Sequence, residues 1–213
     1  MAAARAQMAE GPDDDALPPA FRRAVAALGR VSCRPEVRID PMPAPKRLAP
    51  FAHAVEASVE VDGEELADGR FVLLHDPQGQ DSWQGTFRVV TLTRAELEAE
   101  MAADPLLPEV TWSWLTGALQ ARAVACGQAG GTVTRASSHY FGALADRVPQ
   151  AEIEIRASWT PMGPMGVPDT AEHLAAWCDL LCQCAGLPPE HGDGRHGGGG
   201  VVPLPPRRGP HPL

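Results

Sequence analysis

The stretch AEIEIRASW, residues 151–159, determines the fold class of this chain. Its residues alternate between two sets: Ile153, Ile155, Ala157 and Trp159 are apolar, whereas Glu152, Glu154, Arg156 and Ser158 are polar. Because successive side chains of a β-strand point to opposite faces, a period of two places each set on its own face. The stretch therefore predicts a strand with one face in the core and the other toward solvent.

The same alternation occurs upstream, where Val55, Ala57, Val59 and Val61 are separated by Glu56, Ser58 and Glu60. Shorter apolar or β-branched runs predict further strands at residues 71–74, 86–93 and 132–139. The continuous run 71–74 is typical of a strand covered on both faces. Asp62-Gly63 and Asp68-Gly69 are expected to mark turns before it.

Helical spacing appears before, between and after these strands. Pro18 and Pro19 precede a short amphipathic pattern through Leu28. The capping-box sequence Thr93-Arg94-Ala95-Glu96 predicts a short helix through Met101. A longer helix is expected to carry Trp112, Leu115, Leu119 and Cys126 near one stripe and to end at Gly127, Gly130 and Gly131, and a final helix is expected to follow Asp169.

These elements predict an α+β fold in the order α-β-β-β-α-β-β-α. We expect a mainly antiparallel sheet of about five strands with helices packed on one face, because the clearest strands each have one polar face. One domain should span residues 17–187, between disordered tails at residues 1–16 and 188–213. Residues 34–50 are rich in proline and predict an extended arm, in which Val37 and Ile39 could form a brief edge strand.

The formal net charge of the chain is −9, but residues 20–50 carry seven basic and two acidic side chains. An acidic chain repels phosphate backbones, so nucleic-acid binding is expected only through the basic segment 22–47. The candidate binding residues there are Arg22, Arg23, Arg34, Arg38, Lys46 and Arg47. The alternative is that this segment packs against the acidic remainder of the chain.

The five cysteines form an odd set without the spacing of a secreted disulfide framework, which predicts reduced thiols. Cys178 and Cys182 share a helix face while Cys184 points elsewhere, so these thiols and His173 are not expected to hold a metal. His191 and His196 lie in a glycine-rich tail without a rigid frame. We expect no metal or cofactor and, because no run is long and apolar enough to span a bilayer, a cytoplasmic protein without membrane contact.

Candidate catalytic residues occur at the end of a predicted strand, where His75, Asp76 and Asp81 fall in the polar stretch HDPQGQDSW. A histidine beside carboxylates can act as an acid or base near neutral pH. The alternative is structural, with Asp76 and Gln78 hydrogen-bonded to the loop backbone. No glycine-rich phosphate loop, GxSxG, HExxH or paired CxxC motif occurs in the chain.

Trp112 and Trp114 are candidate binding residues, because they lie about 200° apart on a helix and so cannot face the same core. One of them could lie at an interface or groove. Alternatively, that tryptophan packs against a second layer of the same domain, which would account for the pair equally well.

Three stretches carry a family resemblance: FVLLHD at 71–76 with the turn that follows, DPLLPEVTWSWL at 104–115 and EIEIRASWTP at 152–161, together with FRRAV at 21–25 and the arm 34–50. Over about residues 17–187 the chain resembles an actinobacterial family known as a domain of unknown function, number three thousand. That resemblance implies no activity, ligand or catalytic residue. Members of the family often lie near a ribonuclease D-like exonuclease, which is an associational hint toward RNA metabolism.

We expect a non-catalytic protein-binding or adaptor domain that takes a protein partner or forms a homodimer. The expectation depends on abundant tryptophan without an assembled catalytic set. The alternatives are a small enzyme with its site around His75, Asp76 and Asp81, and an accessory protein of RNA metabolism that uses the basic segment 22–47.

Overall fold

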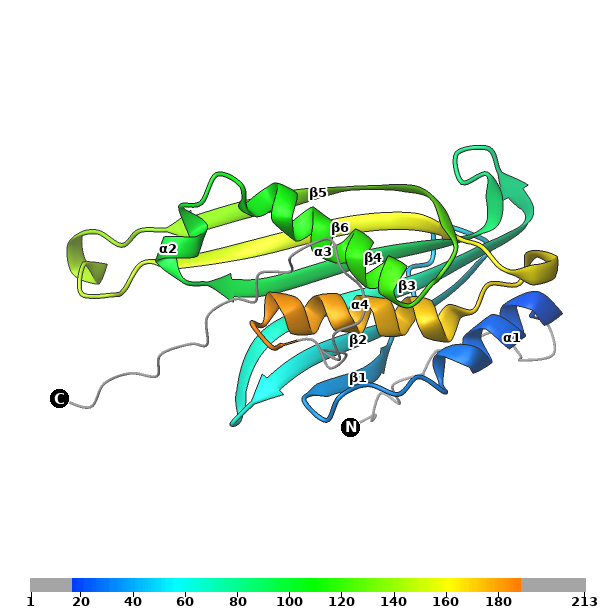
Figure 1. Cartoon of the computed structure of the whole chain (residues 1–213), viewed down its shortest axis with the longest axis horizontal. Helices are drawn as coiled ribbons and strands as arrows, with labels where there is room; N and C mark the ends of the chain where they lie inside the picture. Colours follow the sequence, from blue (N-terminus) through cyan, green and yellow to red (C-terminus); the bar gives the residue numbers. More distant parts are fainter. Residues whose placement is uncertain (1–16, 189–213) are drawn as a thin grey trace, which may run out of the picture.

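A computed structural model describes residues 17–188, so the predicted tails, with His191 and His196, lie outside the described residues except for Pro188. Six strands form one sheet in the order β1-β2-β3-β4-β6-β5, and every neighbouring pair is antiparallel (Figure 1). The strands are β1 (Val37–Met42), β2 (Phe51–Val61), β3 (Glu64–Gln80), β4 (Gly85–Leu97), β5 (Cys126–Ser138) and β6 (Gln150–Pro161).

The helices are α1 (Pro19–Leu28), α2 (Ala99–Ala102), α3 (Leu107–Ala121) and α4 (Thr170–Cys184), with single 3₁₀ turns at Gly142–Leu144 and Pro164–Gly166. In Figure 1, α1, α3 and α4 lie across the same face of the sheet, with α4 between the other two. The predicted α+β fold, an antiparallel sheet with helices on one face, is confirmed.

The core lies between the sheet and these helices. Ile153, Ile155, Ala157 and Trp159 are each at most 4% exposed, whereas Glu152 and Arg156 on the other face of β6 are exposed. Trp177 of α4 is fully buried and packs against Phe71 of β3, with ring centroids 5.8 Å apart. Burial of one strand face under the helices therefore accounts for the alternating pattern of β6.

The sixth strand is β1, which forms within the proline-rich arm at the position of Val37 and Ile39. It pairs with β2 on one side, with Val37 opposite Val59 and Ile39 opposite Ala57. Pro41 belongs to this strand and is tolerated because β1 is an edge strand, where a residue without an N–H leaves no central ladder bond unmade.

The helix start predicted from the capping box at Thr93–Glu96 is wrong, because β4 continues to Leu97; the short helix expected through Met101 is α2, which contains only Ala99–Ala102. Thr93 is fully buried, and its Oγ1 accepts a hydrogen bond of 3.0 Å from Nε1 of Trp177. Pairing of β4 with β6 also continues past this point, with Ala95 opposite Ile153. Tertiary contacts here override a local helix-start signal.

The turn predicted at Asp68-Gly69 is also wrong, because both residues lie inside β3. A Cβ on Gly69 would stand 2.7 Å from Cζ2 of Trp177 and 2.3 Å from the carbonyl oxygen of Leu92. Glycine is required there for the close approach of the Trp177 ring rather than for a turn. The run 71–74 is not covered on both faces throughout, since Val72 is only half-buried.

The third predicted helix ends earlier than expected, at Ala121 instead of beyond Cys126. Cys126 begins β5, and Gly127, Gly130 and Gly131 belong to this strand and to its bulge opposite β6. A Cβ on Gly131 would stand 2.9 Å from Cζ3 of Trp112 and 2.2 Å from a backbone oxygen of β6. Gly131 therefore admits the ring of Trp112 against the sheet, and none of these three glycines terminates a helix.

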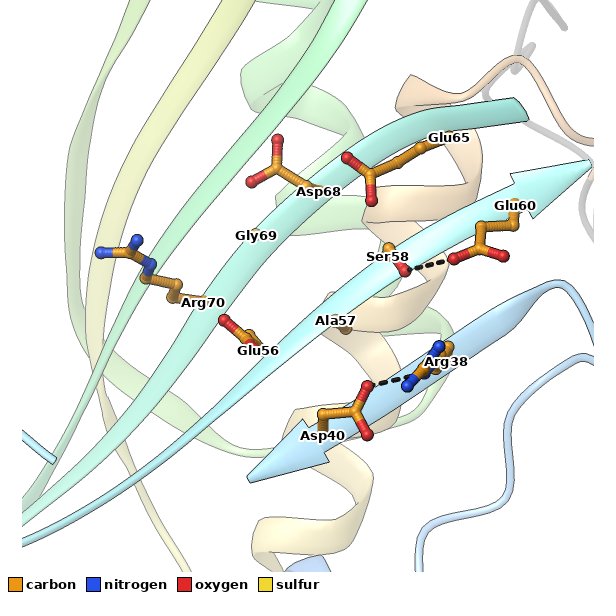
Figure 2. A pocket seen from close by; sticks show the side chains of 10 residues that line it. All are labelled: Arg38, Asp40, Glu56, Ala57, Ser58, Glu60, Glu65, Asp68, Gly69 and Arg70. Atoms are coloured by element: carbon orange, nitrogen blue, oxygen red, sulfur yellow. Dashed lines mark hydrogen bonds and ion pairs between the residues drawn. The ribbon is translucent and has the colours of Figure 1, made fainter. Parts of the chain in front are cut away.

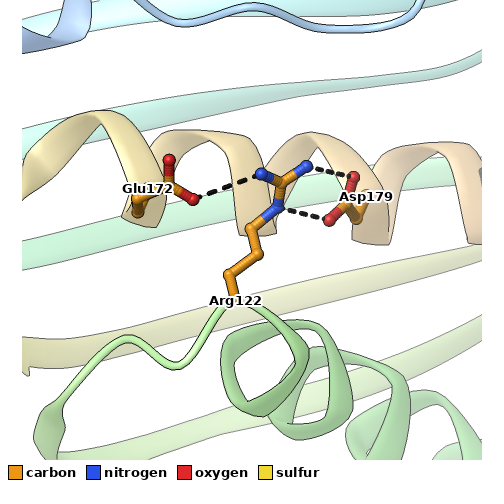
Figure 3. A network of polar contacts seen from close by, with 3 residues as sticks. All are labelled: Arg122, Glu172 and Asp179. Atoms are coloured by element: carbon orange, nitrogen blue, oxygen red, sulfur yellow. Dashed lines mark hydrogen bonds and ion pairs between the residues drawn. The ribbon is translucent and has the colours of Figure 1, made fainter. Parts of the chain in front are cut away.

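An ion-pair network joins α3 to α4 just after α3 ends (Figure 3). Arg122 donates from Nε and Nη2 to the carboxylate of Asp179 at 2.6 and 3.0 Å, and from Nη1 to Glu172 at 3.3 Å. One guanidinium thus holds two turns of α4 beside the end of α3. Within residues 17–188, no helix is both long and apolar enough to span a membrane.

Candidate functional site

The face of the sheet opposite the helices carries polar and apolar side chains in rows that run across the strands. The registers of the six strands define three such rows, which we call the open face: Arg38, Ser58, Asp68, Arg94, Glu154 and Thr134; Asp40, Glu56, Arg70, Leu92, Arg156 and Thr132; and Met42, Ala54, Val72, Val90, Ser158 and Gly130. Within residues 17–188, α1, α3 and α4 all lie on the other side of the sheet.

The half of the open face on β1, β2 and β3 is acidic. A hollow of about 340 Å³ there is lined by the carboxylates of Asp40, Glu56, Glu60, Glu65 and Asp68 and by two arginines, Arg38 and Arg70. Figure 2 shows that the Arg38 guanidinium meets Asp40, at 2.7 Å, and that Ser58 Oγ donates to Glu60 at 3.4 Å. Five acids against two bases give this half a negative charge.

The half on β3, β4 and β6 is basic and has an apolar floor. A second hollow, of about 500 Å³, is lined by Arg70, Arg94 and Arg156 around the half-buried side chains of Val72, Val90 and Leu92. Arg70 lines both hollows, and in Figure 2 its guanidinium points away from Glu56. It forms no ion pair with another residue of the described range.

Glu154 is the one carboxylate at the centre of this basic half. It accepts 2.6 Å and 3.0 Å contacts from the Nε atoms of Arg156 and Arg94, respectively. The hydrogen bond from Arg156, aided by that from Arg94, lowers the pKa of Glu154. Since two guanidinium groups share a single carboxylate, the pair of arginines keeps a positive charge for a ligand or partner.

Arg88 adds a further cation beside this half, and it donates hydrogen bonds to three neutral acceptors. It donates to Ser158 Oγ at 2.7 Å, to the Gln128 carbonyl at 2.9 Å and to Thr160 Oγ1 at 3.1 Å. Partial burial lowers its pKa, although a guanidinium remains charged at any physiological pH. These contacts fix the side chain in one orientation.

His75 lies on the helix side of β3 and is only 3% exposed. Its Nδ1–H donates to the Thr86 carbonyl oxygen at 2.9 Å, and its ring stacks on Phe87 with centroids 4.2 Å apart. Phe21 and Phe51 pack against the same ring. Burial among these aromatic rings lowers the pKa of His75 and favours the neutral imidazole.

The two carboxylates predicted to act with His75 have other surroundings. Asp76 points to the opposite face of β3 by strand alternation, and its Oδ1 accepts the backbone N–H of Gln78 at 3.0 Å. Asp81 is exposed in the turn after β3. The structure therefore places the three candidates in one segment but in separate environments, and Asp76 makes the loop contact of the structural alternative.

Both candidate tryptophans pack within the domain. Trp114 is 7% exposed and belongs to the core, and half-buried Trp112 stands over Gly131 of β5. This arrangement corresponds to the second-layer alternative, with the two rings on different sides of α3.

The basic residues of segment 22–47 do not gather on one surface. Arg22 and Arg23 are exposed on α1, on the helix side, whereas Arg38 lies on the open face. Arg34 is bound to Glu36 at 3.1 Å and to the Pro188 carbonyl at 2.6 Å. Lys46 and Arg47 are exposed in the connection between β1 and β2.

Cys178, Cys182 and Cys184 are all buried in α4, and the structure brings Cys33, just before the arm, to Cys178. The hydrogen bond with Cys33 and burial raise the pKa of Cys178, and burial raises the pKa of Cys182 to about 12. His173 also faces the core, where its Nδ1 accepts a hydrogen bond from Trp159. These thiols are protonated at neutral pH and behave as core side chains.

Apart from Arg38, sequence reasoning did not identify the residues that form the open face as a candidate site, notably Arg70, Arg94, Val72, Val90 and Leu92. The available signal was strand alternation, which already placed Glu56, Glu154 and Arg156 outward. What was missing was the register between strands, which sets the charged residues beside one another.

Comparison with curated proteins and with solved structures finds no match to the chain. A family model described as a protein of unknown function, DUF3000, matches residues 17–194, and it confirms the resemblance stated from the sequence. The chain therefore belongs to the DUF3000 family.

Proposed function

We propose that the protein is a cytoplasmic, non-catalytic protein-binding domain whose binding surface is the open face. The observation that carries this proposal is the strip of Val72, Val90 and Leu92, which lies half-buried between carboxylates on one side and guanidinium groups on the other. An apolar centre with a charged rim is the usual anatomy of a protein interface.

The shape and charge of the face favour a protein over other ligands. Its two hollows lie side by side on a sheet surface, share Arg70 and together extend from β1 to β5. Small-molecule sites instead enclose most of the ligand surface in one cleft. A nucleic acid would bring phosphates against the five carboxylates of the acidic half, where repulsion opposes binding.

A site-specific photo-crosslinker tests this proposal in living cells. Placed at Leu92, at the centre of the open face, it should form a covalent product with a protein, identified by mass spectrometry. The matched control position is Gln120, which is exposed on α3 on the helix side. Products from both positions alike, or none from Leu92, would contradict the assignment of the open face.

A further inference from the structure

We propose that the partner of the open face is a second copy of this chain, so that two open faces stack about a twofold axis between β3 and β4, parallel to the strands. This inference rests on the proposed function, because it names the occupant of the same surface. It would make the protein a homodimer with two sheets face to face and the helices outside.

The strand order supplies the geometry. In the order β1-β2-β3-β4-β6-β5, the midline of the sheet falls between β3 and β4. A twofold axis that is parallel to the strands and lies above this midline, on the side of the open face, stacks the two sheets and exchanges their halves. It sets β3 opposite the partner's β4, β2 opposite the partner's β6, and β1 opposite the partner's β5.

Two pairs of opposite charges on the open face match under this rotation. In the row that contains Arg70, the register places Glu56 opposite the partner's Arg156. In the adjacent row, Asp68 comes opposite the partner's Arg94. Because an isologous interface repeats every contact, each of these two pairs forms twice, which makes four contacts between an acid of one copy and an arginine of the other.

The apolar side chains also coincide. Val72 comes opposite the partner's Val90, next to the axis, in the row where Ala54 faces the partner's Ser158. Arg70 comes opposite the partner's Leu92, and its aliphatic stem can cover that side chain while its guanidinium reaches the rim. Sheets that stack face to face cross at about 30°, so these pairings describe neighbourhoods rather than fixed contacts.

The area is sufficient for a stable dimer. Six strands spaced about 4.8 Å apart, with an average length of about ten residues, form a sheet whose face has an area of roughly 800 Å². That is about the area per partner buried in a specific protein interface.

Charge exchange tests the inference on the full-length chain. One variant carries Glu56→Arg and Asp68→Arg, which makes the acidic half basic, and the other carries Arg94→Glu and Arg156→Glu, which makes the basic half acidic. Sedimentation at about 100 μM, where a micromolar dissociation constant leaves mostly dimer, should show a wild-type dimer and two monomeric variants. Mixed in equal amounts, the two variants should form a heterodimer, because each altered half meets a complementary one.

A matched control carries Arg23→Glu and Arg30→Glu, two exposed residues at α1 and just after it, and should remain dimeric. Circular dichroism checks that every variant is folded. If a double variant is not, the single exchanges Glu56→Arg and Arg156→Glu replace it. A monomeric wild type, dimers that persist in both variants, or a mixture that stays monomeric would overturn the inference. If Leu92 then crosslinks to a different protein, the proposed function stands and only the second copy is excluded.

Discussion

The indole Nε1 of Trp159 donates a hydrogen bond to Nδ1 of His173, 3.1 Å away, and so joins β6 to α4 inside the core. Both residues are at most 1% exposed. The imidazole must be neutral to accept this bond, and burial lowers the pKa of His173 to about 4. The folded protein thus holds a histidine that the unfolded chain would protonate in mildly acidic solution.

We predict that the free energy of unfolding decreases as the pH is lowered from about 6.5 toward 4. Over this range the unfolded chain binds a proton at His173 that the folded chain does not, so stability must decrease with decreasing pH, by up to about 3 kcal/mol. His75, whose pKa is also lowered by burial, contributes in the same direction. Urea unfolding at pH 7, 6 and 5 measures the slope.

Replacement of the exposed His139 by glutamine is the matched control and should keep the slope of the wild type. His173→Gln removes the titrating group, so its slope should be shallower at lower overall stability. Identical slopes in the wild type and in His173→Gln would contradict this account.

A second prediction concerns the close approach at Gly69. Gly69→Ala places a methyl group 2.3 Å from the Leu92 carbonyl oxygen and 2.7 Å from Trp177, so it should destabilise the protein by about 3 kcal/mol or more. Gly117→Ala is the control, because a Cβ at this exposed position of α3 meets nothing within 4 Å. That change should stabilise by about 0.5 to 1 kcal/mol through helix propensity. Equal melting temperatures for wild type and Gly69→Ala would show that the Trp177 ring can shift with little loss of stability.

The strands of the sheet show which parts of the fold could be predicted from the sequence and which could not. The half-buried strands β2 and β6 were predictable, because one face under helices and one toward solvent forces a period of two. The full length of β3 was not, since Asp68-Gly69 has the composition of a turn and the ring that requires Gly69 is more than 100 residues away in the chain. Local composition cannot report a contact of that kind.

A third prediction concerns the hydrogen bond between Thr93 and Trp177, which also joins residues far apart in the chain. Thr93→Val keeps the shape of the side chain but removes the acceptor of the Trp177 Nε1–H, which leaves a buried donor unpaired. We expect a loss of about 1 to 3 kcal/mol, whereas Thr93→Ser retains the hydroxyl and should lose less. Denaturant unfolding compares the two. A serine variant less stable than the valine variant would show that packing of the methyl group outweighs the hydrogen bond.

The open face was predictable in part. Alternation assigns Glu56 and Arg156 to the polar face of their own strands, but nothing in the sequence states that Arg70 lies between Glu56 and Leu92, or that β6 is next to β4. Those relationships come from the register and from the pairing of β4 with β6, which α2, α3 and β5 separate in the chain. The charge division of the face is therefore a property of the fold that sequence periodicity alone does not contain.

The last prediction separates the two faces of β6 at adjacent positions. Ile155 is 1% exposed and lies between Thr93 and Val133, so Ile155→Ala removes buried methyl groups and should cost about 2 to 5 kcal/mol. Glu154, on the open face, is paired with Arg94 and Arg156 near solvent, and pairs of this kind contribute at most about 1 kcal/mol. At protein concentrations low enough to keep the chain monomeric, Glu154→Gln should therefore change the free energy of unfolding by no more than that amount.

Salt provides the control for this comparison, because screening weakens the Glu154 pairs and leaves burial of Ile155 unaffected. As the ionic strength is raised, urea unfolding should show a smaller difference in the free energy of unfolding between wild type and Glu154→Gln. The loss caused by Ile155→Ala should persist. A loss for Glu154→Gln that equals that of Ile155→Ala and grows with protein concentration would have a different cause. It would mean that the carboxylate is buried against another molecule, since only association makes stability depend on concentration.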